Sequence, residues 1–196
     1  MSITLQQSRP ALPEGTTLAP TLSFIEGQWV KGATSVPVLD KYTGEVFAEV
    51  SEPSAEQVAQ AVTAARKAFT VGAPPPHARA AVLRRCAELV DRYRKRFIDH
   101  IVADAGFTVA DATGELERAI VTLMLSAEEA TRLVGEQVAF AASPGQHKRI
   151  GFTIRVPLGI VCAITPFNSP LNTAVHKIAP SLASGNAVIL KPASYT

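Results

Sequence analysis

The chain has 196 residues, of which 47% are hydrophobic and 18% are charged, so it is expected to form a core and is not a disordered protein. Its formal net charge of +2 is too small to indicate a nucleic-acid or anionic-membrane partner, and no apolar run approaches the roughly 20 residues of a membrane-spanning helix. Two cysteines do not make a disulfide framework and no secretory signal opens the chain, which predicts a cytoplasmic location.

The N-terminal part is predicted to be a flexible arm followed by a β-ribbon. Residues 1–20 contain three prolines and few large apolar side chains, which is typical of a loosely held arm. Residues 21–53 form the ribbon, with turns at Lys31-Gly32 and over residues 41–45. Its short strands are expected over residues 24–30, 36–40 and 46–50. We expect this ribbon to be a surface element without chemistry.

Residues 54–138 are predicted to be helical. Ser54 and Gln57 form a capping-box pattern at the start of the first helix. Apolar side chains at helical spacing predict further helices. The expected helices cover residues 54–71, 78–103 and 113–134. One face of the second helix is basic but interrupted by acidic residues, so we interpret it as a solvated face and not as a polyanion site.

The C-terminal third is predicted to contain strands and one more helix. Residues 139–156 begin as a loop, and their second half alternates polar and apolar residues, which predicts a half-exposed strand over residues 149–156. Residues 157–196 have the pattern of one βαβ unit, with strands over residues 159–164 and 187–190. Ser169 is the expected N-cap of the helix between them, followed by Pro170 in its first turn.

Both strands of the βαβ unit are apolar and rich in β-branched residues, which predicts a parallel sheet buried on both faces. We expect its crossover to be right-handed. The sequence ends directly after the second strand, so the sheet is expected to be truncated there. Ligands of such sheets bind beyond the carboxyl ends of the strands, which focuses attention on residues 164–168 and 191–194.

Three polar side chains lie in these two segments. Asn168 follows the first strand, where its amide could donate a hydrogen bond to a developing oxyanion or simply stabilise a turn. Lys191 follows the second strand at its carboxyl end, where it could meet a ribose or phosphate or be an ordinary strand-end lysine. Ser194 could bind a hydroxyl or a phosphate, or cap a helix. Position alone leaves these alternatives open.

The remaining chemistry-bearing residues indicate no site of their own. Cys86 lies on the apolar stripe of a predicted helix and Cys162 lies within a predicted buried strand. We interpret both as small core residues, because a reactive thiolate needs an accessible, electropositive setting. The sequence contains no metal-ligand cluster, no G-x-G-x-x-G and no Walker-type loop.

Four segments of the C-terminal region carry a family resemblance. They are PLGIV at 157–161, ITPFNSPL at 164–171, KIAPSLASGN at 177–186 and VILKPA at 188–193. In these segments, and upstream in IEGQWV at 25–30, the chain resembles the NAD(P)-dependent aldehyde dehydrogenases. The resemblance implies an α/β, aldehyde dehydrogenase-like fold: an N-terminal β-ribbon and helices, then the start of a Rossmann-like parallel sheet, truncated after the second strand.

The resemblance also implies roles for particular residues. Members of the family oxidise an aldehyde to the acid through a cysteine thiohemiacetal and thioester, with NAD or NADP as hydride acceptor. By resemblance, Asn168 is the side-chain donor of the oxyanion hole and Lys191 contacts the adenosine ribose. The residues expected to line the cofactor cleft are Ile164, Thr165, Pro166 and Phe167. Position 194 is often Glu in the family; Ser194 would not repel a 2′-phosphate, so NADP is admissible beside NAD.

The same resemblance divides the chain and indicates its partners. Residues 54–138 would be the helical part of the cofactor-binding domain, residues 139–156 a strand segment of the oligomerisation region, and residues 157–196 the first βαβ of the cofactor-binding domain. The expected partners are a small-molecule aldehyde and further copies of the chain in a dimer or tetramer. The sequence around Asn168 is similar to that of relatives acting on small polar aldehydes such as lactaldehyde.

The family's nucleophilic cysteine and catalytic glutamate lie beyond residue 196, and neither Cys86 nor Cys162 matches the nucleophile. We therefore expect the 196-residue chain alone to have no dehydrogenase turnover. An alternative is a short non-catalytic nucleotide-binding or assembly module of the same fold. A third hypothesis, an unrelated nucleotide-binding βαβ protein, requires the motif match to be accidental.

Overall fold

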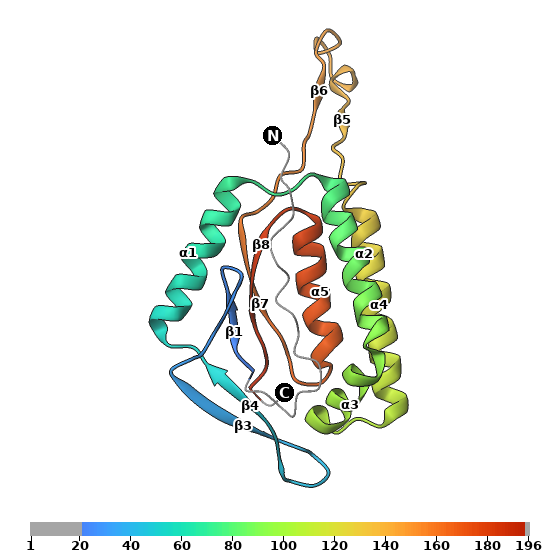
Figure 1. The fold of residues 1–196 in the computed structure, drawn as a ribbon. Helices are drawn as coiled ribbons and strands as arrows, with labels where there is room; N and C mark the ends of the chain where they lie inside the picture. Colours follow the sequence, from blue (N-terminus) through green and yellow to red (C-terminus); the bar gives the residue numbers. More distant parts are fainter. Residues whose placement is uncertain (1–20, 195–196) are drawn as a thin grey trace.

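The computed structural model describes residues 21–194, in which helices surround a short parallel sheet and a β-ribbon lies to one side (Figure 1). The predicted arm, residues 1–20, lies outside the described residues. The helices are α1 (Ala55–Val71), α2 (Pro76–Arg92), α3 (Arg94–Ala105), α4 (Val109–Glu129) and α5 (Pro170–Ala183), with a 3₁₀ turn η1 (Phe140–Ala142). The strands are β1 (Ser23–Ile25), β2 (Gln28–Val30), β3 (Thr34–Leu39), β4 (Val46–Glu52), β5 (Gln137–Val138), β6 (Gly151–Phe152), β7 (Ile160–Ile164) and β8 (Ala187–Lys191).

The N-terminal ribbon consists of two antiparallel hairpins, β1–β2 and β3–β4. The prediction of one strand over residues 24–30 is wrong, because the chain turns at Glu26 and Gly27. Both residues have positive φ, 49° and 81°, as tight two-residue hairpin turns require. The predicted turn over residues 41–45 is confirmed as the β3–β4 loop. It is attached to the helices by the Lys41 N–H, which donates to the Ala103 carbonyl at 2.9 Å.

The capping box at the start of α1 is confirmed. The Gln57 N–H donates to Ser54 Oγ at 3.2 Å, and the Ser54 N–H donates to Gln57 Oε1 at 2.8 Å. Two N–H groups at the helix start therefore have partners that water would otherwise have to supply. The helix ends at Gly72, as expected, where φ is 100°.

Replacing Ser54 with alanine is expected to lower the free energy of unfolding by about 1 kcal/mol, because the Gln57 N–H loses its acceptor. Urea denaturation of the two proteins measures the difference. Thr63→Ala is the matched control, since this exposed α1 side chain bonds only to the Ala59 carbonyl of its own helix. A loss no larger than that of Thr63→Ala would contradict the capping role.

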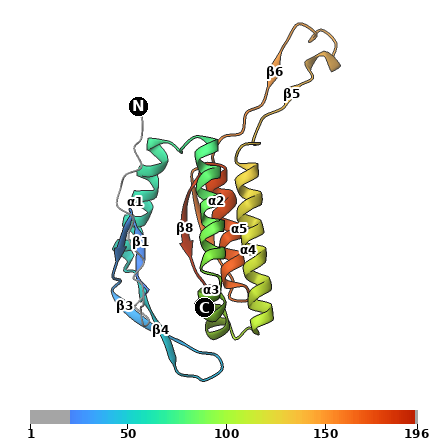
Figure 2. The same cartoon turned by 45° about the vertical axis from the view of Figure 1, so that its right-hand side comes forward.

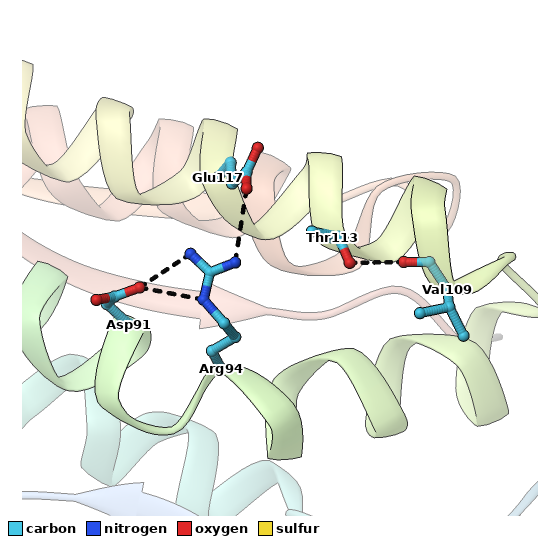
Figure 3. Close-up of polar contacts among 5 residues, drawn as sticks. All are labelled: Asp91, Arg94, Val109, Thr113 and Glu117. Atoms are coloured by element: carbon cyan, nitrogen blue, oxygen red, sulfur yellow. Dashed lines mark hydrogen bonds and ion pairs between the residues drawn. The ribbon is translucent and has the colours of Figure 1, made fainter.

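The helix predicted over residues 78–103 is in fact two helices, α2 and α3. The chain leaves helical geometry at Tyr93, with φ −98° and ψ 21°. This bend allows both helices to pack against α4. Arg94, the first residue of α3, bonds through Nη2 to Asp91 Oδ1 at 2.9 Å and lies 3.5 Å from Glu117 Oε1 of α4 (Figure 3). The bend is thereby connected to both neighbouring helices.

Helix α4 begins and ends earlier than the predicted span of 113–134. Gly106 ends α3 in the left-handed conformation, with φ 71°, and the Thr108 side chain accepts a hydrogen bond from the Asp111 N–H as N-cap. Thr113 lies inside the first turns and donates its hydroxyl to the Val109 carbonyl at 2.7 Å (Figure 3). The cap at Thr108 thus sets the helix start that apolar periodicity alone misplaced.

The core lies where α2, α4 and α5 meet, and small side chains dominate it. Its members are Ala80, Leu83, Ala87, Ala119, Leu123, Ala127, Ala130, Val175, Ala179 and Ala183. Alanine on facing helices lets the backbones approach closely, so this packing holds α5 firmly against α4. The charged residue Glu115 of α4 is also fully buried.

The segment between α4 and β7 projects away from the body as a long hairpin (Figures 1 and 2). The strand predicted over residues 149–156 is regular only in β6, which pairs antiparallel with β5. The Thr153 N–H extends the contact by donating to the Glu136 carbonyl at 2.8 Å. Apolar side chains along this hairpin, including Ile150 and Phe152, are exposed.

The predicted βαβ unit is confirmed: β7 and β8 pair in parallel and α5 connects them. Gly185 follows the helix with φ 85°, as expected of a helix stop. The prediction that both sheet faces are buried is wrong for the described residues, since Cys162 and Ile164 of β7 are exposed. Helix α5 and part of α1 pack on the sheet, but they leave this side of β7 uncovered.

Candidate active site

The carboxyl ends of β7 and β8 lie side by side, at the lower edge of the sheet in Figure 1. Ile164 is in register with Lys191, and the Thr165 N–H donates to the Lys191 carbonyl at 3.2 Å. The strand pairing therefore continues one residue past β7. It brings the two predicted ligand segments, residues 164–168 and 191–194, to the same edge.

The turn after β7 presents mostly accessible side chains. Ile164 and Phe167 are about three-fifths exposed, at 61% and 57%, and Pro166 and Asn168 are also exposed. Thr165 is buried, so of the four predicted cleft-lining residues it contributes least surface. Asn168 precedes α5 by two residues and is exposed. An amide in this place can donate to a ligand that enters beyond the strand ends.

Lys191 and Ser194 form the other side of the edge. Lys191 Nζ lies 3.3 Å from Ser194 Oγ, and both residues are exposed. An ammonium beside a hydroxyl offers several donors and one acceptor within a few ångströms, which suits the hydroxyls of a ribose or the oxygens of a phosphate. The end of β8 and the residues that follow it thus bring Lys191 and Ser194 together.

The start of α5 differs from the prediction in one respect. Ser169 has φ −165° and ψ 72°, and its side chain makes no capping hydrogen bond. The helix start is instead capped from α4: Glu115 Oε1 accepts hydrogen bonds from the N–H groups of Leu171, at 2.8 Å, and Asn172, at 2.9 Å. Pro170 occupies the first turn as expected.

Sequence reasoning missed Glu115, although the sequence holds a signal for it. The buried face of α4 includes Ala112, Leu116, Ala119 and Leu123, and Glu115 lies on the same face. A carboxylate in an apolar stripe is costly unless charge-assisted hydrogen bonds compensate it, so its position indicates a buried acceptor role. Which donors it serves, 56 and 57 residues further along the chain, is not visible in the pattern.

The two cysteines differ in their surroundings. Cys86 is half-buried, and burial raises the pKa of its thiol, which agrees with the interpretation as a core residue. Cys162 is exposed, so the interpretation as a buried strand residue is wrong. It pairs with Ile189 in the middle of the sheet and not at the strand ends. Among residues 21–194, no group of three or more His, Cys, Asp or Glu side chains could hold a metal ion.

In the 196-residue chain, Cys162 is expected to react with a thiol reagent at least about tenfold faster than Cys86 at pH 8, because a raised pKa leaves less thiolate and burial limits access. Single variants Cys86→Ser and Cys162→Ser isolate each thiol for the measurement. Equal rates in the two variants would contradict the assigned environments.

Polar side chains beyond the carboxyl ends of parallel strands joined by a crossover helix are typical of nucleotide-binding α/β proteins. The profile of the aldehyde dehydrogenase family matches residues 29–196, and the chain belongs to this family. No helix within residues 21–194 is both long and apolar enough to cross a membrane.

Particular relatives support this assignment. The chain is 40% identical over 173 residues to the 3-sulfolactaldehyde dehydrogenase of Priestia aryabhattai. It is similar to the crystal structure of an NAD-dependent benzaldehyde dehydrogenase from Corynebacterium glutamicum, with 34% identity and a TM-score of 0.81 over 92% of this chain and 40% of that one. It is also similar to an NADP-dependent glyceraldehyde-3-phosphate dehydrogenase from Bacillus halodurans complexed with NADP, with 30% identity and a TM-score of 0.84 over 92% of this chain and 38% of that one.

These similarities cover the chain far more completely than they cover its relatives. The match to 3-sulfolactaldehyde dehydrogenase includes 88% of this chain but 36% of that protein. The N-terminal ribbon, the helices and the first βαβ unit therefore correspond to about a third of a family member. Aldehyde oxidation with NAD or NADP is the chemistry of the family to which this chain belongs.

Proposed function

We propose that this chain forms one wall of the active site of an NAD(P)-dependent aldehyde dehydrogenase, within the complete polypeptide of which it is a part. The observation that carries the proposal is that Asn168 is exposed in the turn directly after β7, the strand that pairs in parallel with β8. When the nucleophile attacks the aldehyde carbonyl, negative charge develops on the carbonyl oxygen. The side-chain N–H of Asn168 donates to this oxygen, and a fixed donor stabilises the charge more in the transition state than in the ground state.

The nucleophile is proposed to be a cysteine thiolate outside this chain, as the resemblance implies. Cys86 is half-buried in the helical layer and Cys162 lies in mid-strand, so neither is at the edge that holds Asn168. The 196-residue chain alone is therefore proposed to have no turnover.

The cofactor is proposed to be NAD or NADP, which when bound supplies the acceptor for the hydride of the aldehyde. The Lys191–Ser194 pair supports this, because its donors and acceptor suit a ribose. Ile164 and Phe167, which directly precede Asn168 in the chain, expose apolar surface, and with Pro166 they would line the cleft. Thr165 would support the cleft through its backbone bond to Lys191.

The substrate class is proposed to be a small polar aldehyde. The support is the sequence similarity to a 3-sulfolactaldehyde dehydrogenase, which spans the turn that holds Asn168. A cytoplasmic location is part of the proposal and rests on the cysteine content.

Assembly into a dimer or tetramer is proposed to involve residues 139–156, while residues 54–138 and 157–196 belong to the cofactor-binding domain. The exposed apolar side chains of the projecting hairpin, such as Ile150 and Phe152, support the first point, since large exposed apolar side chains are typical of interaction surfaces. The packing of α2, α4 and α5 into one core supports the second.

The test is reduction of NAD and NADP by the complete polypeptide with a series of aldehydes: lactaldehyde and sulfonated or phosphorylated three-carbon aldehydes, with benzaldehyde as the apolar comparison. We expect aldehyde-dependent turnover that is faster with the polar aldehydes, and none from the 196-residue chain alone. Cofactor binding without turnover in the complete polypeptide would favour the alternative of a non-catalytic nucleotide-binding module.

Replacing Ser194 with glutamate is expected to weaken NADP binding at least about tenfold while changing NAD binding little, because a carboxylate repels a 2′-phosphate and can accept hydrogen bonds from the ribose hydroxyls. Dissociation constants for both cofactors, measured by titration calorimetry on the complete polypeptide, provide the readout. Ser194→Ala is the control that removes the hydroxyl without adding charge. An equal loss for NAD and NADP in Ser194→Glu would place the 2′-position away from Ser194.

A further inference from the structure

The N-terminus of α5 is held by a side chain from another helix. Pro170 has no N–H, so Leu171 and Asn172 carry the first two N–H groups of the helix, and both donate to Glu115 Oε1. The Thr173 N–H donates to the Ser169 carbonyl at 3.1 Å. One carboxylate oxygen therefore satisfies the donors that a local N-cap side chain usually serves.

This arrangement costs stability as well as supplying it. Glu115 is fully buried, and its second oxygen, Oε2, has no hydrogen-bond partner among the described residues. A negative charge at a helix N-terminus is stabilised by the helix dipole and by charge-assisted hydrogen bonds. Desolvation of a carboxylate opposes this gain, and apolar replacements of buried charges are often neutral for stability. Net stability alone therefore does not account for a carboxylate at residue 115, whereas a role in positioning the start of α5 does.

Glu115 is itself fixed in space. Its neighbour Leu116 is fully buried, and α4 packs against α2, α3 and α5. The Arg94 guanidinium connects Glu117 of the same helix to the α2–α3 bend. The carboxylate thus connects the start of α5 to a helix that is itself held on several sides.

We propose that Glu115 is a positioning residue for Asn168. Two residues separate Asn168 from Leu171, and one of them is Pro170, whose ring fixes φ. The short connection has little conformational freedom. Fixing the N–H groups of Leu171 and Asn172 therefore also fixes the turn that holds Asn168. The inference rests on the proposed function in that Asn168 is taken as the oxyanion donor.

Backbone hydrogen exchange tests the positional part without any activity. In Glu115→Ala, exchange at Leu171 and Asn172 is expected to rise about tenfold, because two N–H groups lose their acceptor. The rise is expected to extend to Thr165, whose N–H donates to the Lys191 carbonyl at the start of the same turn. Glu115→Gln keeps the volume and an acceptor oxygen, so it should fold and show a smaller rise at the same residues. Ser54→Ala, which removes the cap of α1, is the matched control and should leave residues 165–172 unchanged.

A kinetic double-mutant cycle in the complete polypeptide tests the link to catalysis. Glu115→Gln is expected to lower kcat about tenfold in the unsubstituted protein and less than twofold in the Asn168→Ala background, because it acts through Asn168. The KM for the aldehyde and the dissociation constant of the cofactor should change less than twofold.

The outcomes are distinguishable. Exchange changes confined to Leu171 and Asn172, or an equal loss of kcat in both backgrounds, would overturn the positioning role. Absence of aldehyde oxidation by the unsubstituted complete polypeptide would refute the proposed function instead. In that case exchange at Thr165 would still decide whether Glu115 sets this turn.

Discussion

Replacing Asn168 with alanine in the complete polypeptide is expected to lower kcat by about 10²- to 10³-fold, the usual effect of removing one oxyanion donor. The KM for the aldehyde should change little, because the carbonyl oxygen carries its negative charge only after nucleophilic attack. Steady-state kinetics with the best aldehyde substrate provide the measurement. Asn168→Asp should be equally impaired, since a carboxylate cannot donate and would repel the oxyanion.

Ser169→Ala is the matched control for this result. Ser169 is the next residue in the same turn, and its side chain does not cap α5. We expect its kcat to remain within about twofold of the unsubstituted value. A loss of less than tenfold in Asn168→Ala, or similar losses in Asn168→Ala and Ser169→Ala, would show that the Asn168 amide is not the oxyanion donor.

Replacing Leu116 with alanine is expected to lower the free energy of unfolding by about 2–5 kcal/mol, the largest stability effect we anticipate. Leu116 is 0% exposed on the face of α4 that also holds Glu115, so the substitution loses buried apolar surface and leaves a cavity. Urea denaturation gives the difference from the midpoint and slope of the transition.

Leu125→Ala provides the control on the same helix with the same chemical change. Leu125 is 55% exposed, so its truncation is expected to cost less than about 1 kcal/mol. Equal losses for the two variants would contradict the placement of Leu116 in the interior and, with it, the firm support that the inference assigns to Glu115.

The parts of the fold that the sequence predicted are those set by neighbouring residues. The βαβ unit follows from two β-branched apolar runs around an amphipathic helix, and the α1 capping box follows from Ser54 and Gln57 alone. The position of the segments that follow β7 and β8 at one edge follows from a topological rule, since parallel strands end at the same edge.

The parts that escaped prediction depend on contacts between distant segments. The spacing of apolar residues runs through Tyr93 without interruption, so the sequence gives no sign of the bend there. The bend allows α2 and α3 both to pack on α4. The exposed face of Cys162 depends on how much of the chain covers the sheet, which periodicity does not encode. The sequence predicted a local N-cap of α5 at Ser169, but Glu115 caps the helix from more than 50 residues away.

The turn at Glu26-Gly27 was also not predicted, although it is a local feature. Glu-Gly is a weaker hairpin signal than Asn-Gly or Asp-Gly, and the apolar residues on both sides, including Trp29, favoured one continuous strand. The positive φ of both turn residues resolves the choice. The error did not affect the prediction of the site, which depends on β7, α5 and β8.

The central claim is that the shared edge of β7 and β8 is a wall of a dehydrogenase active site. A crystal structure of the complete polypeptide with bound NADP tests it most directly. We expect Lys191 Nζ to lie about 3 Å from a ribose oxygen of the cofactor, with the nicotinamide directed toward Asn168. A cofactor bound away from Lys191 and Asn168 would contradict it.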